Sequence, residues 1–165
     1  MKSAKFLILF ITLTSFVSAD VKLPSIFGDN MVLQQGIENP IWGWADSGEK
    51  VTIHIEGHDK KLDSMAGKSA RWQLKLPKLK ASNEPIEITI KGKNTITLKN
   101  VLIGEVWVCS GQSNMQWPVD ASNDPDLEKL SANYPKIRFI TVPRIGSQEP
   151  QNDFEGQWEA CNPET

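Results

Sequence analysis

The sequence is poor in the residues that build cross-linked or metal-bound sites. Its 165 residues include only two Cys, two His and one Tyr. Cys109 and Cys161 are far apart and do not form the spacing pattern of a disulfide framework. We expect two buried free thiols. The alternative is a bridge between them, which an oxidising compartment permits.

The sequence also lacks any block of Lys and Arg, and its formal net charge is −2. It therefore has no electrostatic footprint for a nucleic-acid partner. Hydrophobic residues make up 39% and charges of both signs are mixed, so a packed core is expected rather than disorder. The length suits one domain, or one small domain and part of another.

The first nineteen residues have the features of a secretory signal peptide. Lys2 and Lys5 form a basic start, residues 6–17 are almost entirely apolar, and small residues follow at 17–19. The run is too short for a membrane-spanning helix, and no later run is long enough to cross a bilayer. We expect a secreted or periplasmic protein that begins at Asp20. The alternative is a buried first strand or helix.

Residues 20–98 have the texture of an all-β domain. Apolar and polar residues alternate in residues 51–56, 71–76 and 86–91, and each such run gives a strand one dry face. Turn signals rich in Gly, Asn, Asp and Pro separate the runs. This pattern predicts an antiparallel β-sandwich over residues 20–100.

The texture changes at residue 101. Residues 101–110 read VLIGEVWVCS, which is typical of a strand buried on both faces of a parallel sheet. A helix is predicted over 124–134 and a strand over 137–142. Residues 101–165 thus predict the start of an α/β domain. One such start cannot cover its own sheet, so the chain is expected to be truncated.

Ser113 is the residue best placed for chemistry. It follows the apolar run within Gly111-Gln112-Ser113-Asn114-Met115. In an α/β sheet, ligands bind at the carboxyl ends of the strands, where free backbone N–H groups stabilise a developing oxyanion. From these residues alone, a turn serine with a solvent-facing hydroxyl is an equal alternative.

Several segments resemble the sialate O-acetylesterase family, a branch of the SGNH hydrolases. The segments are GEVWVCSGQSNMQWPV (104–119), LPSIFGDNMVLQQ (23–35), IWGWADSGEKVTI (41–53), ITIKGKNTITLKNVLIGEVW (88–107) and CNPET (161–165). The resemblance implies a flavodoxin-like three-layer SGNH hydrolase domain, of which residues 101–165 are the incomplete start. It also implies a serine esterase that uses no metal or organic cofactor. The expected partner is an O-acetylated sialic acid or another acetylated carbohydrate, with no nucleic acid, and no membrane after signal cleavage.

The resemblance assigns Ser113 as nucleophile and its backbone N–H as the first oxyanion donor. Gln112, Asn114 and Trp117 are candidates for pocket wall or support. The family's further oxyanion donors, a Gly and an Asn, and its catalytic His and Asp are absent from the sequence. We therefore expect a fragment that is inactive alone. Its alternatives are a non-catalytic carbohydrate-binding or structural module, or an esterase for acetylated plant polysaccharides.

Four other reactive residues are interpreted differently. His54 lies on the polar face of a predicted strand and His58 in the next turn, so we expect two exposed histidines rather than a base or a metal pair. Cys109 and Ser110, close to Ser113, are expected to be packing residues.

Expressed in a Gram-negative host, the product should leave the cytoplasm and begin at Asp20, because the basic start, apolar run and small residues direct cleavage there. N-terminal sequencing of the mature protein checks this. An intact Met1 on the exported product would contradict it.

Overall fold

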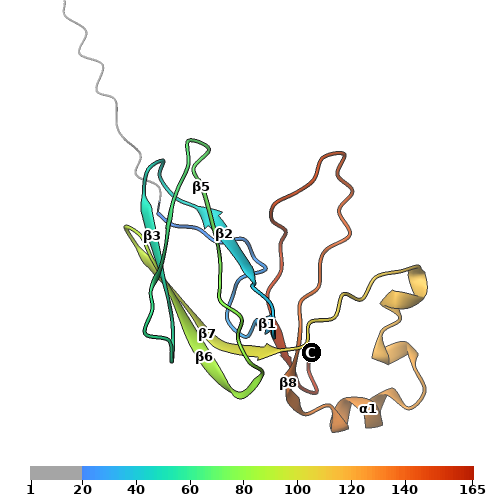
Figure 1. Cartoon of the computed structure of the whole chain (residues 1–165). Helices are drawn as coiled ribbons and strands as arrows, with labels where there is room; N and C mark the ends of the chain where they lie inside the picture. The colour runs from blue at the N-terminus through green and yellow to red at the C-terminus, as the bar shows by residue number, and fades with distance from the viewer. Residues whose placement is uncertain (1–19) are drawn as a thin grey trace, which may run out of the picture.

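The computed structural model describes residues 20–165 (Figure 1). The predicted signal peptide, residues 1–19, lies outside the described residues. Strands dominate the described chain and helices are few, as the sequence of its first part predicts. The strands are β1 (Val32–Gln34), β2 (Pro40–Trp44), β3 (Lys50–Ile55), β4 (Leu62–Met65), β5 (Arg71–Lys75), β6 (Ser82–Lys91), β7 (Thr95–Gly104), β8 (Tyr134–Phe139) and β9 (Glu159–Cys161). The helices are the 3-10 turns η1 (Ser113–Gln116) and η2 (Val119–Ala121) and the α-helix α1 (Pro125–Ser131).

The largest sheet has five strands in the order β1-β7-β6-β3-β4. Its neighbours pair antiparallel except β1 and β7, which run parallel with Val32 opposite Leu102 and Gln34 opposite Gly104. The alternation in β3 holds as predicted: Ile53 is buried and His54 is exposed. Side chains point to opposite faces along a strand, so the polar set meets water and the apolar set meets the core.

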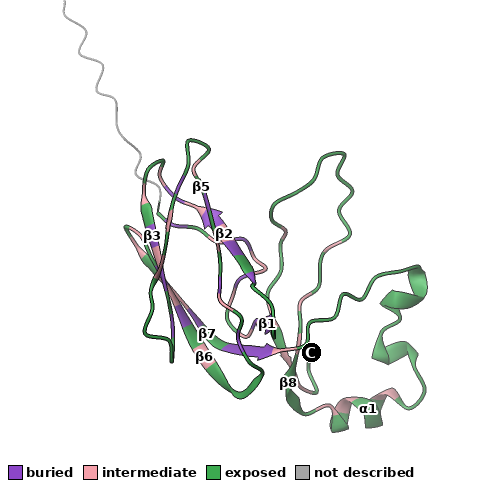
Figure 2. Ribbon diagram, viewed as in Figure 1, coloured by how far each residue is buried: buried purple, intermediate pink, exposed green. Residues whose placement is uncertain are grey.

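A two-stranded sheet of β2 and β5 contributes to the same core. Ile41 from β2 and Trp72 from β5 belong to one hydrophobic cluster with the buried faces of β3, β6 and β7. Trp72 is only 1% exposed. Figure 2 shows the buried residues concentrated in these strands. Burial of each such side chain contributes about 1.5–3 kcal/mol, so this shared cluster is the main stabilising feature of residues 20–104.

The strand predicted over 101–110 is correct only to Gly104. Residues 101–103 are buried, but as the end of β7 in the five-stranded sheet, so the boundary expected between residues 100 and 101 falls inside β7. Residues 105–112 belong to no strand of the described chain, and Trp107 and Val108 are 82% and 91% exposed. An apolar run forms a buried strand only where neighbouring strands exist to flank it.

The later elements also differ in detail from expectation. The helix α1 is shorter than the predicted 124–134, and Leu127 and Leu130 on it are exposed. The strand predicted over 137–142 is β8, which begins at Tyr134 and pairs antiparallel with β9. Within residues 20–165, β8 does not pair with the apolar run before Ser113, so the expected parallel unit is not formed there. In the same residues no helix combines the length and the apolar character that crossing a membrane requires.

The last part of the chain, which contains β8 and β9, is fixed to the β region by polar and apolar contacts. Trp158 packs against the core cluster, and its Nε1 donates to the carbonyl of Ile26 at 2.8 Å. Arg138 in β8 donates to Asn30 Oδ1 at 3.1 Å and to Asn100 Oδ1 at 3.3 Å. Burial lowers the pKa of the Arg138 guanidinium. These contacts dock β8 and β9 beside β1 and β7, as Figure 1 shows.

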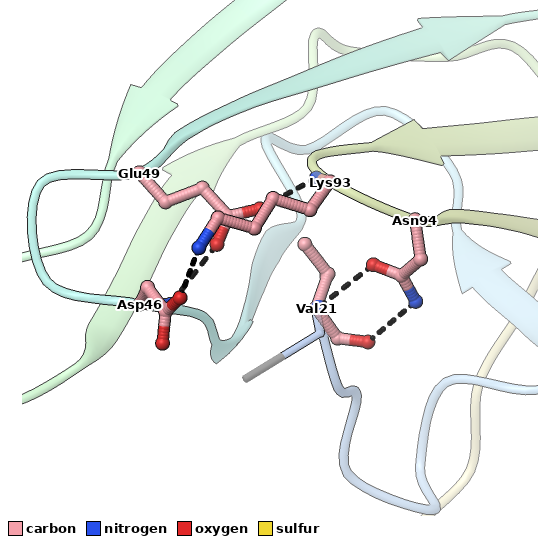
Figure 3. A network of polar contacts seen from close by, with 5 residues as sticks. All are labelled: Val21, Asp46, Glu49, Lys93 and Asn94. Atoms are coloured by element: carbon pink, nitrogen blue, oxygen red, sulfur yellow. Dashed lines mark hydrogen bonds and ion pairs between the residues drawn. The ribbon is translucent and has the colours of Figure 1, made fainter. Parts of the chain in front are cut away.

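The first described residues are fastened by a polar network at the β6–β7 turn (Figure 3). Val21 is 2% exposed, and its N–H donates to Asn94 Oδ1 at 2.7 Å while its carbonyl accepts from Asn94 Nδ2 at 3.1 Å. Glu49 accepts from the backbone N–H of Lys93 at 2.6 Å and of Asp46 at 3.0 Å. Lys93 forms an ion pair with Asp46, and that hydrogen bond raises the pKa of Lys93.

Replacing Asn94 by Ala should lower the free energy of unfolding by about 1–3 kcal/mol, because two backbone groups of buried Val21 lose their partners. Urea denaturation measures the change. Asn83→Ala is the matched control. Asn83 is exposed and its side chain makes no hydrogen bond within the described residues, so its effect should stay within about 0.5 kcal/mol. Equal values for the two variants would show that the Asn94 contacts are not stabilising.

Candidate functional site

Ser113 is the first residue of η1 and lies in a tight, exposed turn. Gln112 precedes it with an extended backbone, φ −82° and ψ −176°, and the N–H of Met115 donates to the Gln112 carbonyl at 2.9 Å. Within residues 20–165 neither the Ser113 hydroxyl nor its backbone N–H makes a hydrogen bond. The first N–H groups of a helical turn have no intrahelical partner. Ser113 is therefore an exposed residue whose hydroxyl and backbone N–H are both without a hydrogen-bond partner in the described chain.

Gly111 gives this turn its compact form. A Cβ at Gly111 would lie 2.8 Å from Cγ of Met115. Carbon atoms in ordinary contact lie about 3.5–4.0 Å apart, so any larger residue would push the Met115 side chain away. The glycine thus lets Met115 fold back against the residues that precede Ser113.

Trp117 lies beside the turn in a defined orientation. Its Nε1 donates to the carbonyl of Ala121 in η2 at 2.7 Å, and its backbone N–H donates to the carbonyl of Asn114 at 3.2 Å. The ring is largely exposed. The Asn114 side chain makes no hydrogen bond within residues 20–165, so its carbonyl alone contributes to the turn. An indole held at its N–H leaves its apolar faces free for contact.

The structure does not bring a histidine to Ser113. His54 lies in β3 and His58 in the turn that follows, and both are exposed as predicted. In Figure 1, β3 lies across the β region from the yellow-to-gold segment that follows β7. Residues 20–165 also hold no group of three or more His, Cys, Asp or Glu side chains that is suited to a metal ion.

Both cysteines are free thiols, as expected. The expectation that they are buried is wrong. Cys109 is exposed and Cys161 is half-buried. The expectation of a buried Cys109 is wrong for the reason given above: the chain leaves the sheet at Gly104. Ser110 is exposed in the same coil, so it is not a packing residue either.

Sequence reasoning missed the side chains that bind the start of the segment between β7 and Ser113. Glu105 accepts hydrogen bonds from Gln34 Nε2 at 3.0 Å and from Gln35 Nε2, and the N–H of Val106 donates to Gln34 Oε1 at 2.8 Å. The two donors, Gln34 first, lower the pKa of the Glu105 carboxyl. The available signal was that Glu105 is the one charge in the apolar run.

Two surface depressions lie between the sheets and the last residues of the chain. One, of about 620 Å³, is lined by Phe27, Asn30 and Trp158 among others, and the second, of about 320 Å³, by Trp42 and Phe154 among others. Neither is lined by Ser113 or its neighbours. The described residues thus place Ser113 on open surface rather than in either depression.

Exposed apolar side chains are concentrated in the segment that contains Ser113. Thirteen of the fifteen large hydrophobic residues that are exposed in the described chain fall between residues 106 and 145. Exposed apolar patches larger than a few hundred Å² are rare on monomers and mark surfaces that another structure covers. The thirteen are Val106, Trp107, Val108, Met115, Trp117, Val119, Leu127, Leu130, Tyr134, Ile137, Phe139, Val142 and Ile145.

Comparison with known proteins gives one consistent group of relatives. No family model matches the sequence. The chain is 32% identical over 146 residues to "Sialate O-acetylesterase" of Rattus norvegicus and 33% identical over 144 residues to that of Mus musculus. These matches cover 82% and 81% of this chain but 27% and 26% of the two relatives. This chain thus spans about a quarter of their length.

Among solved structures, a carbohydrate acetylesterase from Xanthomonas citri has the same arrangement, with a TM-score of 0.83 at 29% identity. The match covers 88% of this chain and 33% of that one.

Amides of residues 107–112 should exchange hydrogen at least tenfold faster than those of residues 101–103. The first group has no hydrogen-bond acceptor in the described chain, whereas the second belongs to a buried, paired strand. Hydrogen exchange on a monomeric sample of this chain measures both groups at once, with β3 as internal reference. Equal protection of the two groups would mean that the coil after Gly104 is a strand after all.

Proposed function

The chain is a relative of the sialate O-acetylesterases, spanning about a quarter of their length, and from this relationship we propose that it carries the nucleophile of a serine esterase. The enzyme removes O-acetyl groups from sialic acids or related sugars. The observation that carries the proposal is Ser113, in an exposed turn with both its hydroxyl and its N–H free of partners.

Two domains underlie this proposal. The first domain is a β-sandwich that begins at Asp20 and ends with β7 at Gly104, and its two sheets share one core. The residues after Gly104 begin an SGNH hydrolase domain. The apolar surface of residues 106–145 supports this division, because the rest of such a domain would cover it. The relatives are long enough to supply that part, and the solved acetylesterase matches the fold of 88% of the present chain.

The chemistry follows from what Ser113 offers and what it lacks. Its Oγ attacks the acetyl carbonyl, and a base outside the described residues takes the hydroxyl proton, since a serine hydroxyl is a weak nucleophile without one. The backbone N–H of Ser113 donates to the oxyanion of the tetrahedral intermediate. Collapse expels the sugar oxygen, which takes up a proton. Water then cleaves the acetyl-serine to acetate and restores the enzyme.

Three neighbours of Ser113 have supporting roles in this proposal. Gln112 and Asn114 flank the nucleophile in the turn. The exposed ring of Trp117, held by its bond to Ala121, forms a wall on which the pyranose ring of the substrate packs. An aromatic ring with a fixed orientation suits such a surface because little entropy is lost on binding.

Export is part of the same proposal. Residues 1–19 serve as a signal peptide, and the protein acts outside the cytoplasm, in the periplasm or the medium. The position of Val21 supports this. Val21, the second residue after the expected cleavage site, is already buried in the described core.

An esterase for acetylated plant polysaccharides is the second candidate. The similar protein from Xanthomonas citri is a carbohydrate acetylesterase, which favours keeping this wider substrate class. Both candidates use the same nucleophile. Turnover of O-acetylated sialic acid and of acetylated xylan, compared side by side on the protein extended to the length of its relatives, separates them.

The 165-residue chain alone should show no turnover of an activated acetyl ester, because it lacks the base. Removal of a single oxyanion donor already costs about 10²–10³ in kcat, and a triad member costs more. In the protein extended to the length of its relatives, Ser113→Ala should abolish activity and labelling by a fluorophosphonate.

Cys109→Ala and His54→Ala in the extended protein are the controls and should retain the wild-type rate. Activity of the short chain that disappears in His54→Ala would overturn the assignment of the base. Activity of the extended protein that survives Ser113→Ala would overturn the nucleophile.

A further inference from the structure

Three side chains join the end of β1 to the end of β7 directly before the segment that carries Ser113. They are Gln34, Gln35 and Glu105, which we call the glutamine clamp. We propose that the glutamine clamp sets the direction in which the chain leaves β7 and thereby positions Ser113. Its catalytic consequence rests on the proposed function, but its structural role does not.

The glutamine clamp consists of three side-chain hydrogen bonds. The Gln34 amide donates to Glu105 through Nε2 and accepts from the N–H of Val106 through Oε1. Gln35 donates to the second carboxylate oxygen. Hydrogen bonds to a charged acceptor are about twice as strong as neutral ones, so one carboxylate holds both glutamines. The backbone adds a fourth contact, from Gln35 N–H to the carbonyl of Gly104 at 2.8 Å.

The buried side chain of Asn39 binds the backbone of Gln34 and so connects the glutamine clamp to the core. Asn39 is a buried polar residue, 7% exposed, and its side chain accepts from the N–H of Gln34 at 3.2 Å and donates to the Gln34 carbonyl at 2.9 Å. The carbonyl of Asn39 in turn accepts from the N–H of Leu76, next to β5. The backbone of Gln34 is therefore fixed on both sides, which makes its side chain a rigid support for Glu105 and Val106.

No other part of the described sheets forms hydrogen bonds with the segment between β7 and Ser113. Within residues 20–165, all hydrogen bonds between residues 105–112 and the sheets come from Gln34 and Gln35. Residues 107–112 are exposed. The clamp therefore fixes the point and direction from which residues 107–112 lead to Ser113, and in this proposal that starting direction limits where Ser113 can lie. A displacement of about 1 Å at a reacting group can cost about 10² in rate.

Gln34→Met tests the structural half of the proposal in the 165-residue chain. The substitution keeps the shape of the side chain and removes both its donor and its acceptor. Hydrogen exchange at the Val106 amide should become about tenfold faster, since one net hydrogen bond is lost, while exchange in β3 stays unchanged. Gln73→Met, on an exposed position of β5 without a side-chain hydrogen bond in the described chain, is the matched control and should change neither.

Glu105→Gln is a second variant, which tests the glutamine clamp independently if Gln34→Met fails to fold. Its amide has one acceptor oxygen in place of two, so it can hold one glutamine and should give an intermediate exchange rate at Val106. An unchanged rate in both variants, with the fold intact by circular dichroism, overturns the clamp.

The catalytic half is measured in the protein extended to the length of its relatives. Both clamp variants should lower kcat for an acetyl ester by about 10- to 100-fold while KM stays within about twofold, and slow fluorophosphonate labelling of Ser113 equally. An unchanged kcat, with faster exchange at Val106, overturns the positioning role. If the wild-type extended protein hydrolyses no acetyl ester, the proposed function fails, and the exchange experiment still decides the clamp.

Discussion

The parallel pairing of β1 with β7 is the constraint on which the region around Ser113 depends. It brings residues that are about seventy positions apart into register, with Gln34 opposite Gly104. Because β7 is also paired with β6 along its other edge, its exit point is fixed from both sides. The chain that leaves at Gly104 therefore starts from a defined place on a rigid sheet. The sheet thus defines the start of the segment that leads to Ser113, although Ser113 itself lies beyond the sheet in an exposed turn.

Local alternation was enough to predict β3, β5 and the second half of β6, but not the other strands of the β region. In β3 and β5 the period of two places Ile53 and Trp72 in the core, and the structure confirms both. The run from residue 101 to 110 could not be interpreted in the same way, because its apolar residues do not say which neighbours cover them. Its first three enter an existing sheet and the rest face solvent. Cys109 was misplaced for the same reason.

In the candidate site too, local patterns could be predicted from the sequence and contacts between distant residues could not. Ser113 was found because a glycine-rich turn after an apolar run is a local pattern, and the family resemblance gave it a role. The contacts of Gln34 with Glu105 were missed because they join residues that only the strand order brings together. The docking of Trp158 against the core, 132 positions from its acceptor Ile26, was equally beyond a local pattern. Sequence periodicity reports the faces of an element, not the partner that each face meets.

The attachment of Val21 has a mechanical consequence. Asn94 offers it one amide in place of a neighbouring strand, and the next residue, Lys22, adds a single bridge to Trp44. Tension on this end of the chain thus meets its bonds one after another, as in peeling, rather than many at once, as when two long strands are sheared. The first residues would detach at low force, while the ten-residue strands β6 and β7 remain closed.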